Sequence, residues 1–249
     1  MREIRRIQGL KPIGDAPRCH EMEASVKTVD IIYRYGATKT AIRPLPSDSS
    51  KALLRLAQGN KSFAELLDHV KDESGIQQVI LVDPHDLGLV SGSGEMPKQR
   101  PFAAILGCSD ARVPVELIFN EGPNDLFVVR VAGNGLGTEV LGSLKYAVEN
   151  LGGSLKLIVV LGHSGCGALS TAVDVFLNPG DYLPLATKHS LRNILDRLLL
   201  VVQTSARKLL SAGASTEILR FAPAVITPLS PPAGPACREA PRKASFRYC

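Results

Sequence analysis

Two cysteines and one histidine lie where short apolar runs end, in an arrangement that could bind a metal ion. Cys108 follows the apolar run at residues 102–106, whereas His163 and Cys166 follow the run at residues 157–161. In open sheets of parallel strands, ligands collect beyond the carboxyl ends of the strands. Two thiolates and one imidazole suit zinc, and three protein ligands leave a fourth position for water, which is the catalytic rather than the structural pattern.

The residues next to these ligands bear on whether a metal is bound at all. A lone His-x-x-Cys pair is a weak signal, and a buried cysteine is common simply as a small apolar residue. Glycines flank both positions, at Gly107 and at Gly162, Gly165 and Gly167, where the backbone can approach a ligand closely. The spacing therefore favours a metal site but leaves structural cysteines as an alternative.

A charged pair lies in the same segment as the first cysteine. Asp110 and Arg112 both follow Cys108 within four residues. At an ordinary surface such a pair contributes little to stability, whereas beside a metal it would orient the groups around the ion. The sequence alone leaves both interpretations open.

The apolar runs alternate with helical patterns, which predicts an α/β fold with a mostly parallel central β-sheet flanked by helices. The runs at residues 102–106, 126–131 and 157–161 are apolar nearly throughout, as expected for strands with both faces covered. The segments with helical patterns are residues 113–119, 139–151, 167–177 and 188–210. In such a sheet the two cysteine-containing segments can meet at one edge.

The flanks of this pattern divide the chain into three parts. We expect the fold to carry an N-terminal helical extension and an irregular C-terminal tail. By residue number, we expect an N-terminal extension over residues 1–48, a zinc domain over residues 49–220, and a tail, either disordered or aberrant, over residues 221–249. The tail is rich in proline, alanine and arginine and shows no helical or strand periodicity.

Two irregularities are predicted before the first strand of the sheet. A helix is expected to begin at Ser49 or Ser50 and to break at Gly59-Asn60, before a second amphipathic stretch at residues 63–70. The prolines and glycines between residues 83 and 101 predict a loop.

The composition excludes several classes of protein. The net charge is +5, but residues 1–18 and 237–249 each carry a net charge of +3, so the body of the chain is close to neutral. Without a clustered basic surface we expect no nucleic-acid partner. No apolar run approaches the roughly 18 residues of a membrane span, and the N-terminus lacks the apolar region of a secretory signal, so we expect no membrane association. The five widely spaced cysteines favour free thiols in a reducing, cytoplasmic compartment.

The two metal-binding segments resemble those of a known family. The stretch CSDARV at residues 108–113 resembles the Cys-Ser-Asp-Ser-Arg motif of β-class carbonic anhydrases. The stretch LGHSGCGA at residues 161–168 is similar to the second metal motif of that family. Between them, LFVVRVAGN at residues 126–134 and GSLKYAVENL at residues 142–151 resemble the strand, turn and helix that the family places there.

The resemblance implies a role for each matching residue. Cys108, His163 and Cys166 would bind one Zn²⁺ per subunit, and Asp110 and Arg112 would form a dyad beside it. Arg112 and the metal would compete for the Asp110 carboxylate. Asp110 would then be a fourth ligand in a closed, inactive state, and the site would be open when Arg112 holds it.

Two further residues match positions near the substrate in the family. Gln99 stands where plant-type members carry a glutamine that can contact bicarbonate, and Tyr146 matches a tyrosine near the pocket. A solvated loop residue and a helix residue in the core are the alternatives for Gln99 and Tyr146, respectively.

The implied activity is the zinc-dependent, reversible hydration of carbon dioxide to bicarbonate and a proton, via zinc-bound hydroxide, by a homodimer or a higher even oligomer. Hydrolysis of carbon disulfide or carbonyl sulfide at the same site is an alternative, as is a non-catalytic protein that binds zinc or bicarbonate. The chain departs from the family beyond Gly180, where the usual Gly-x-x-Tyr-like pattern is missing. The last strand of the sheet is therefore expected to be absent.

Overall fold

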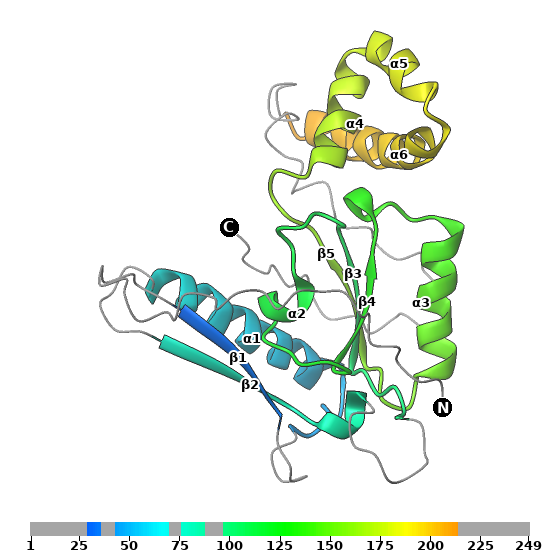
Figure 1. The fold of residues 1–249 in the computed structure, drawn as a ribbon. Coiled ribbons are helices and arrows are strands. Elements are labelled where there is room, and N and C mark those ends of the chain that lie inside the picture. Colours follow the sequence, from blue (N-terminus) through cyan, green and yellow to red (C-terminus); the bar gives the residue numbers. More distant parts are fainter. Residues whose placement is uncertain (1–28, 36–42, 70–75, 88–96, 214–249) are drawn as a thin grey trace, which may run out of the picture.

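The structure, a computed structural model, describes residues 29–35, 43–69, 76–87 and 97–213. Its centre is a parallel sheet in the order β4-β3-β5, made of β3 (Ala103–Gly107), β4 (Leu126–Arg130) and β5 (Leu157–Leu161) (Figure 1). All three strands agree with the predicted runs to within one residue at each end. The prediction of an α/β fold with a parallel sheet is confirmed.

The middle strand, β3, places the ends of its two neighbours together. All five of its residues are buried. Its last residue, Gly107, lies opposite Arg130 of β4 and Leu161 of β5. The carboxyl ends of the three strands therefore meet at one edge, and the segments that follow β3 and β5 become neighbours there although they are far apart in sequence.

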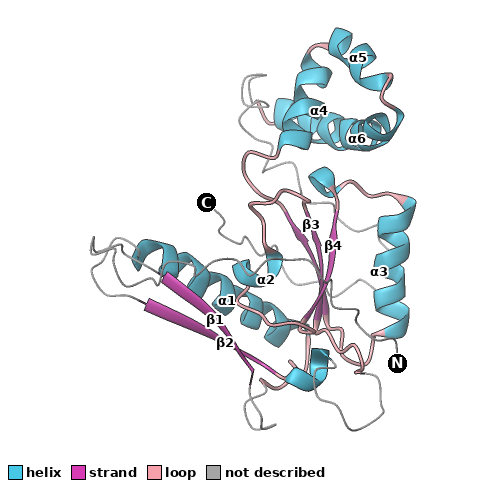
Figure 2. Cartoon of the chain, viewed as in Figure 1, coloured by secondary structure: helices cyan, strands magenta, loops and turns pink. Residues whose placement is uncertain are grey.

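Helices cover both faces of this sheet. Helix α2 (Val115–Ile118) lies between β3 and β4 in the chain, and α3 (Thr138–Asn150) connects β4 to β5. Figure 2 shows α3 on one face and α1 (Ser49–His69), with α2, on the other. The apolar cluster between α1 and the sheet includes Leu56, Phe102 and Ile105, all fully buried.

The predicted break at Gly59-Asn60 is wrong, because α1 runs through both residues as one helix. A Cβ atom on Gly59 would overlap the backbone oxygen of Phe119, so the glycine lets α1 approach the loop after α2. The buried Asn60 donates from its Nδ2 to the carbonyl oxygen of Ile118 at 3.3 Å. The two residues that resemble a helix end are instead the place where α1 packs against α2.

Two strands lie outside the predicted pattern. β1 (Val29–Tyr35) and β2 (Ile76–Val82) form a separate parallel pair. β1 falls within the N-terminal extension expected at residues 1–48, for which no strand was predicted. Ile80 and Val82 of β2 are buried. The short 3-10 helix η2 (Pro84–Leu87) follows within the predicted loop.

The chain after β5 forms a layer of helices beyond the carboxyl end of the sheet (Figure 1). Its elements are α4 (Gly167–Leu177), the 3-10 helix η4 (Pro179–Asp181), α5 (Tyr182–Ala186) and α6 (His189–Ser211). The cluster between α4 and α6 includes Leu198 and Val202 and reaches the side chains of Cys108 and Cys166. The predicted tail at residues 221–249 lies outside the described residues. None of the helices in the described ranges is long and apolar enough to cross a membrane.

Candidate metal centre

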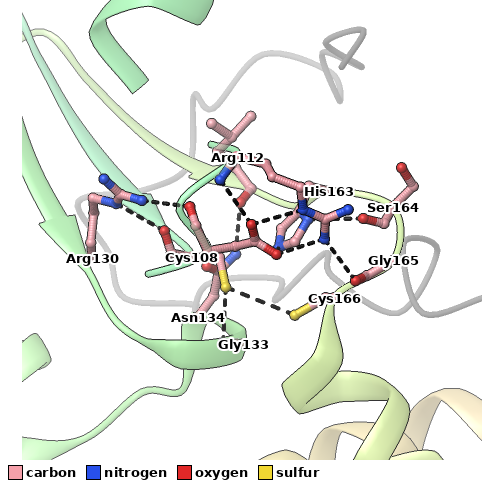
Figure 3. Close-up of polar contacts among 11 residues, drawn as sticks. Cys108, Arg112, Arg130, Gly133, Asn134, His163, Ser164, Gly165 and Cys166 are labelled. Atoms are coloured by element: carbon pink, nitrogen blue, oxygen red, sulfur yellow. Dashed lines mark hydrogen bonds and ion pairs between the residues drawn. The ribbon is translucent and has the colours of Figure 1, made fainter. Parts of the chain in front are cut away.

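Cys108, His163 and Cys166 converge at the edge where the strands end. Cys108 directly follows β3, and the other two follow β5. Because β3 and β5 are adjacent and in register at Gly107 and Leu161, their following loops meet. One ligand atom from each of the three side chains lies within 4.8 Å of the other two (Figure 3). All three residues are buried.

The distance between the two sulfur atoms fits a shared tetrahedral ion. The Sγ atoms of Cys108 and Cys166 are 3.9 Å apart. Two thiolates that each lie about 2.3 Å from a tetrahedral zinc ion are separated by about 3.8 Å. The same 3.9 Å is far longer than the roughly 2.05 Å of a disulfide bond, and both residues are free cysteines.

His163 has one nitrogen engaged and the other unpaired. Its Nδ1 lies 2.9 Å from the carbonyl oxygen of Ser164 and donates to it, which leaves the lone pair on Nε2. Nε2 is buried and has no hydrogen-bond partner among the described residues. An unpaired buried nitrogen is costly, whereas a metal ion beside the two sulfurs would satisfy it. The donor set and this nitrogen therefore fit zinc.

A backbone N–H group supports the first sulfur. The amide of Gly133 donates to the Sγ atom of Cys108 at 3.3 Å. Gly133 has φ +63°, and a Cβ atom there would lie 2.8 Å from Cδ1 of Leu198. Glycine is therefore required for this turn, which belongs to the short 3-10 helix η3 (Ala132–Asn134). The sequence shows the glycine but not its contact with the thiol.

The second sulfur lies at the start of α4, where Cys166 is the N-cap residue. Burial raises the pKa of the Cys166 thiol, and the neighbouring Cys108 adds to that rise, while the backbone N–H groups of Leu169 and Ala168 act in the opposite direction. A thiol must lose its proton to bind a metal. We therefore expect metal binding at this site to release protons and to weaken as the pH falls.

Asp110 and Arg112 form a close pair beside these ligands. The Arg112 guanidinium donates to Asp110 Oδ1 from Nε at 3.0 Å and to Oδ2 from Nη2 at 2.7 Å. The backbone N–H of Arg112 adds a bond of 2.9 Å to Oδ1. These hydrogen bonds hold the pKa of Asp110 well below its usual range, so this carboxylate is ionised at neutral pH.

The same pair connects the two metal-binding segments. Arg112 Nη2 also donates to the carbonyl oxygen of Gly165 at 3.1 Å, between the two ligands on the second segment. Oδ2 of Asp110 lies 4.0 Å from Nε2 of His163. The arginine fork thus holds Asp110 within 4.0 Å of one of the candidate ligand atoms, Nε2 of His163.

Two other predicted site residues do not join this group within the chain. Gln99 is exposed and precedes β3 at the amino end of the sheet, whereas Cys108 follows the carboxyl end of the same strand. Tyr146 lies on α3, half-exposed, and its ring centroid is 6.4 Å from that of Phe127 near the start of β4. A contact of either residue with a substrate at Cys108 would need a second subunit.

One contributor to the site is not singled out by the sequence patterns. Arg130, the last residue of β4, donates to the carbonyl oxygens of Cys108 and Asp110. A cationic residue at the end of an otherwise apolar strand is the signal that could have revealed it. Nearby, Asn134 donates from Nδ2 to the carbonyl oxygen of Leu161 at 2.8 Å and connects the turn after β4 to the end of β5.

Comparisons with known proteins find carbonic anhydrases among the similar proteins. Residues 103–220 match the family model described as carbonic anhydrase. Carbonic anhydrase 2 of Mycobacterium tuberculosis is 45% identical over 102 residues, which are 40% of this chain and 45% of that protein. The carbonic anhydrase of Mycolicibacterium smegmatis is 49% identical over 75 residues, which are 30% of this chain and 35% of that protein. The chain therefore spans less than half the length of these curated relatives.

Among solved structures, a β-carbonic anhydrase of the fungal pathogen Aspergillus fumigatus aligns with a TM-score of 0.35 and 24% sequence identity. That alignment covers 51% of this chain and 55% of the fungal chain.

Proposed function

We infer that this chain is a zinc-dependent carbonic anhydrase of the β class, because its residues 103–220 match the carbonic anhydrase family model. The observation that supports the activity most strongly is the convergence of Cys108, His163 and Cys166 with the Asp110–Arg112 pair beside them. A closed structural site has no need of such a pair. The reaction proposed is the reversible hydration of carbon dioxide to bicarbonate and a proton.

Each side chain of the site has a separate role in the proposed reaction. Cys108, His163 and Cys166 would hold a zinc ion, which when bound lowers the pKa of a water molecule and so supplies a nucleophile near neutral pH. The two thiolates offset the charge of the ion and limit how far that pKa falls. Asp110, fixed by Arg112, is placed to accept a hydrogen bond from a hydroxyl group at the site.

Hydration by the purified chain is expected to be faster at pH 9 than at pH 7 in stopped-flow measurements. The rise is expected because two thiolates leave less positive charge on the ion than neutral imidazoles would. Asp110 cannot be the source of the rise, because its lowered pKa keeps it ionised throughout this range. The matched control is the same protein after removal of zinc by a chelator, which should be inactive at both pH values.

Two outcomes would contradict the proposed activity. Stoichiometric zinc with no hydration at pH 7 or 9 would indicate a protein that binds zinc without turnover. Hydrolysis of carbon disulfide or carbonyl sulfide by a preparation that does not hydrate carbon dioxide would assign the site to the sulfur analogues instead.

We also propose that the active form is a homodimer or a higher even oligomer. Gln99 and Tyr146 lie away from the ligands of their own chain, so they can contact a substrate only in the site of a partner. Leu141 and Val148 on α3, and Ile158 on β5, are each exposed by about half their area (53%, 50% and 45%). In the described residues no strand pairs with the outer edges of β4 and β5. Apolar patches and open edges of this kind favour association.

Sedimentation equilibrium of the zinc-loaded chain is expected to show a dimer or larger even species. Leu141→Glu should shift the equilibrium towards the monomer and lower the hydration rate per chain in proportion, because it buries a charge in the proposed contact. Leu183→Glu is the control, since it makes the same change at an exposed leucine on α5, outside α3 and β5. A fully active monomer would overturn this proposal.

We further propose that residues 49–220 form the catalytic domain and that the protein works in the cytoplasm. The domain proposal is supported by the contact of α1 with the core of the sheet. The location is supported by the free thiols of Cys108 and Cys166, which a reducing compartment preserves.

A further inference from the structure

Arg130 makes two contacts with the loop that carries the first ligand. It is the last residue of β4 and lies opposite Gly107, the residue before Cys108. Its Nε donates to the carbonyl oxygen of Cys108 at 2.9 Å, and its Nη2 donates to the carbonyl oxygen of Asp110 at 2.6 Å (Figure 3). One guanidinium group therefore binds the loop at two points, two residues apart.

These contacts set the direction of two functional side chains. The carbonyl oxygen of Asp110 also accepts from the N–H of Val113 at 3.0 Å, so the turn after Asp110 is fixed from both sides. The rigid guanidinium group of Arg130 holds the carbonyl groups of Cys108 and Asp110. It therefore fixes the orientation of the Cys108 Sγ atom relative to the Asp110 carboxylate. A lysine carries its donors on a single nitrogen and cannot reproduce two parallel bonds of this kind.

The surroundings of Arg130 favour this role over that of an ordinary surface cation. The residue is exposed, yet no carboxylate lies within ion-pair distance of it in the part of the chain that the structure describes. Arg130 donates its hydrogen bonds to backbone oxygens and not to side chains. Removing the guanidinium would return both carbonyl groups to water, so the main loss would be the order of the loop and not the burial of an unpaired group.

We propose that Arg130 is a positioning residue for the reaction, which holds Cys108 and Asp110 in the relative orientation that the metal centre needs. The proposal rests on the proposed function for its effect on turnover, but its effect on the metal site can be measured without turnover. Arg130 does not touch the reacting atoms, and it acts through the backbone of residues 108–110.

The test compares Arg130→Lys and Arg130→Met with the original chain. Arg192→Met is the matched control, because Arg192 is an exposed cation on α6 whose pair with Asp196 lies away from the site. Three quantities are measured for each variant: kcat and KM for hydration, the rate at which a chelator extracts zinc, and the sulfur-to-metal absorption of the cobalt-substituted protein.

Both Arg130 variants are expected to lose roughly 10- to 100-fold in kcat with KM nearly unchanged, since a displacement of about 1 Å in a site can cost that much. Zinc extraction should be faster and the cobalt absorption should change, while Arg192→Met resembles the original chain in all three. In a third variant, Arg130→Ala, free guanidinium ions should restore part of kcat.

Two results would overturn the proposal. The first is an Arg130→Lys variant with the original kcat and cobalt absorption, because a single ammonium group would then suffice. The second is a loss of activity that follows the fraction of unfolded protein, with the cobalt absorption of the folded fraction unchanged. If the original chain does not hydrate carbon dioxide, the proposed function fails, but zinc extraction and cobalt absorption still decide the role of Arg130.

Discussion

The Cys166→Ser variant is expected to lose its zinc and, with it, the hydration of carbon dioxide. Serine has nearly the same shape as cysteine but offers a neutral hydroxyl group where the site presents a soft thiolate. Only Cys108 and His163 would then remain as ligands. Groups that merely orient metal ligands contribute roughly 10- to 100-fold to metal affinity, so the loss of a ligand itself should cost more than about 100-fold.

Zinc content by mass spectrometry after dialysis checks this expectation, together with the hydration rate. Cys237→Ser is the control, because it makes the same chemical change outside both metal-binding segments. We expect the control to keep about one zinc per chain. Stoichiometric zinc and the original turnover in Cys166→Ser would show that the thiol at the start of α4 is not a ligand.

The Arg112→Ala variant is expected to keep its zinc and lose roughly 100-fold or more of its turnover. Without the arginine fork the Asp110 carboxylate has lost its strongest hydrogen bonds. Oδ2 already lies 4.0 Å from Nε2 of His163, so a small rotation would make the carboxylate available as a fourth ligand. The position needed for the reaction would then be closed.

Zinc extraction separates this explanation from simple damage to the site. A fourth protein ligand should slow the removal of zinc by a chelator in Arg112→Ala, whereas a disordered site should release zinc faster. The turnover and the zinc-extraction rate of Arg112→Lys are expected to lie between those of the original chain and those of Arg112→Ala. An ammonium group can hold only one carboxylate oxygen at a time. Full activity in Arg112→Ala would refute the competition for Asp110.

The central sheet and the place of the three candidate ligands at its strand ends were predictable because their signals are local. Each strand of the sheet is a short apolar run, and Cys108, His163 and Cys166 directly follow two of these runs. The adjacency of β3 and β5, on which the site depends, is not encoded in any local pattern. It follows from the strand order, which places β3 between β4 and β5.

The features that the sequence did not predict depend on contacts between distant segments. β1 pairs with β2 from a distant part of the chain, and α1 continues through Gly59 because that glycine allows contact with the loop at Phe119. Four apolar residues of α3 differ in burial, because Leu141 and Val148 are half-exposed while Val140 and Ala147 are buried. A periodic pattern cannot tell a residue buried in the core from one that a partner would cover.

Residues that act through the backbone are the hardest to find from sequence. Gly133 and Arg130 each donate to an atom of Cys108, one to the sulfur and the other to the carbonyl oxygen. Neither contact requires a particular number of residues between the donor and Cys108 in the sequence. Both depend on the register of β4 against β3, which brings the end of one strand beside the loop that follows the other.

X-ray absorption at the zinc K-edge of the purified, zinc-loaded chain tests the account most directly. Cys108, His163 and Cys166 predict two sulfur atoms at about 2.3 Å and one imidazole nitrogen at about 2.0–2.1 Å, with a nitrogen or oxygen atom in the fourth position. A ligand shell that lacks sulfur, or one of four sulfur atoms, would contradict the metal centre described for this chain.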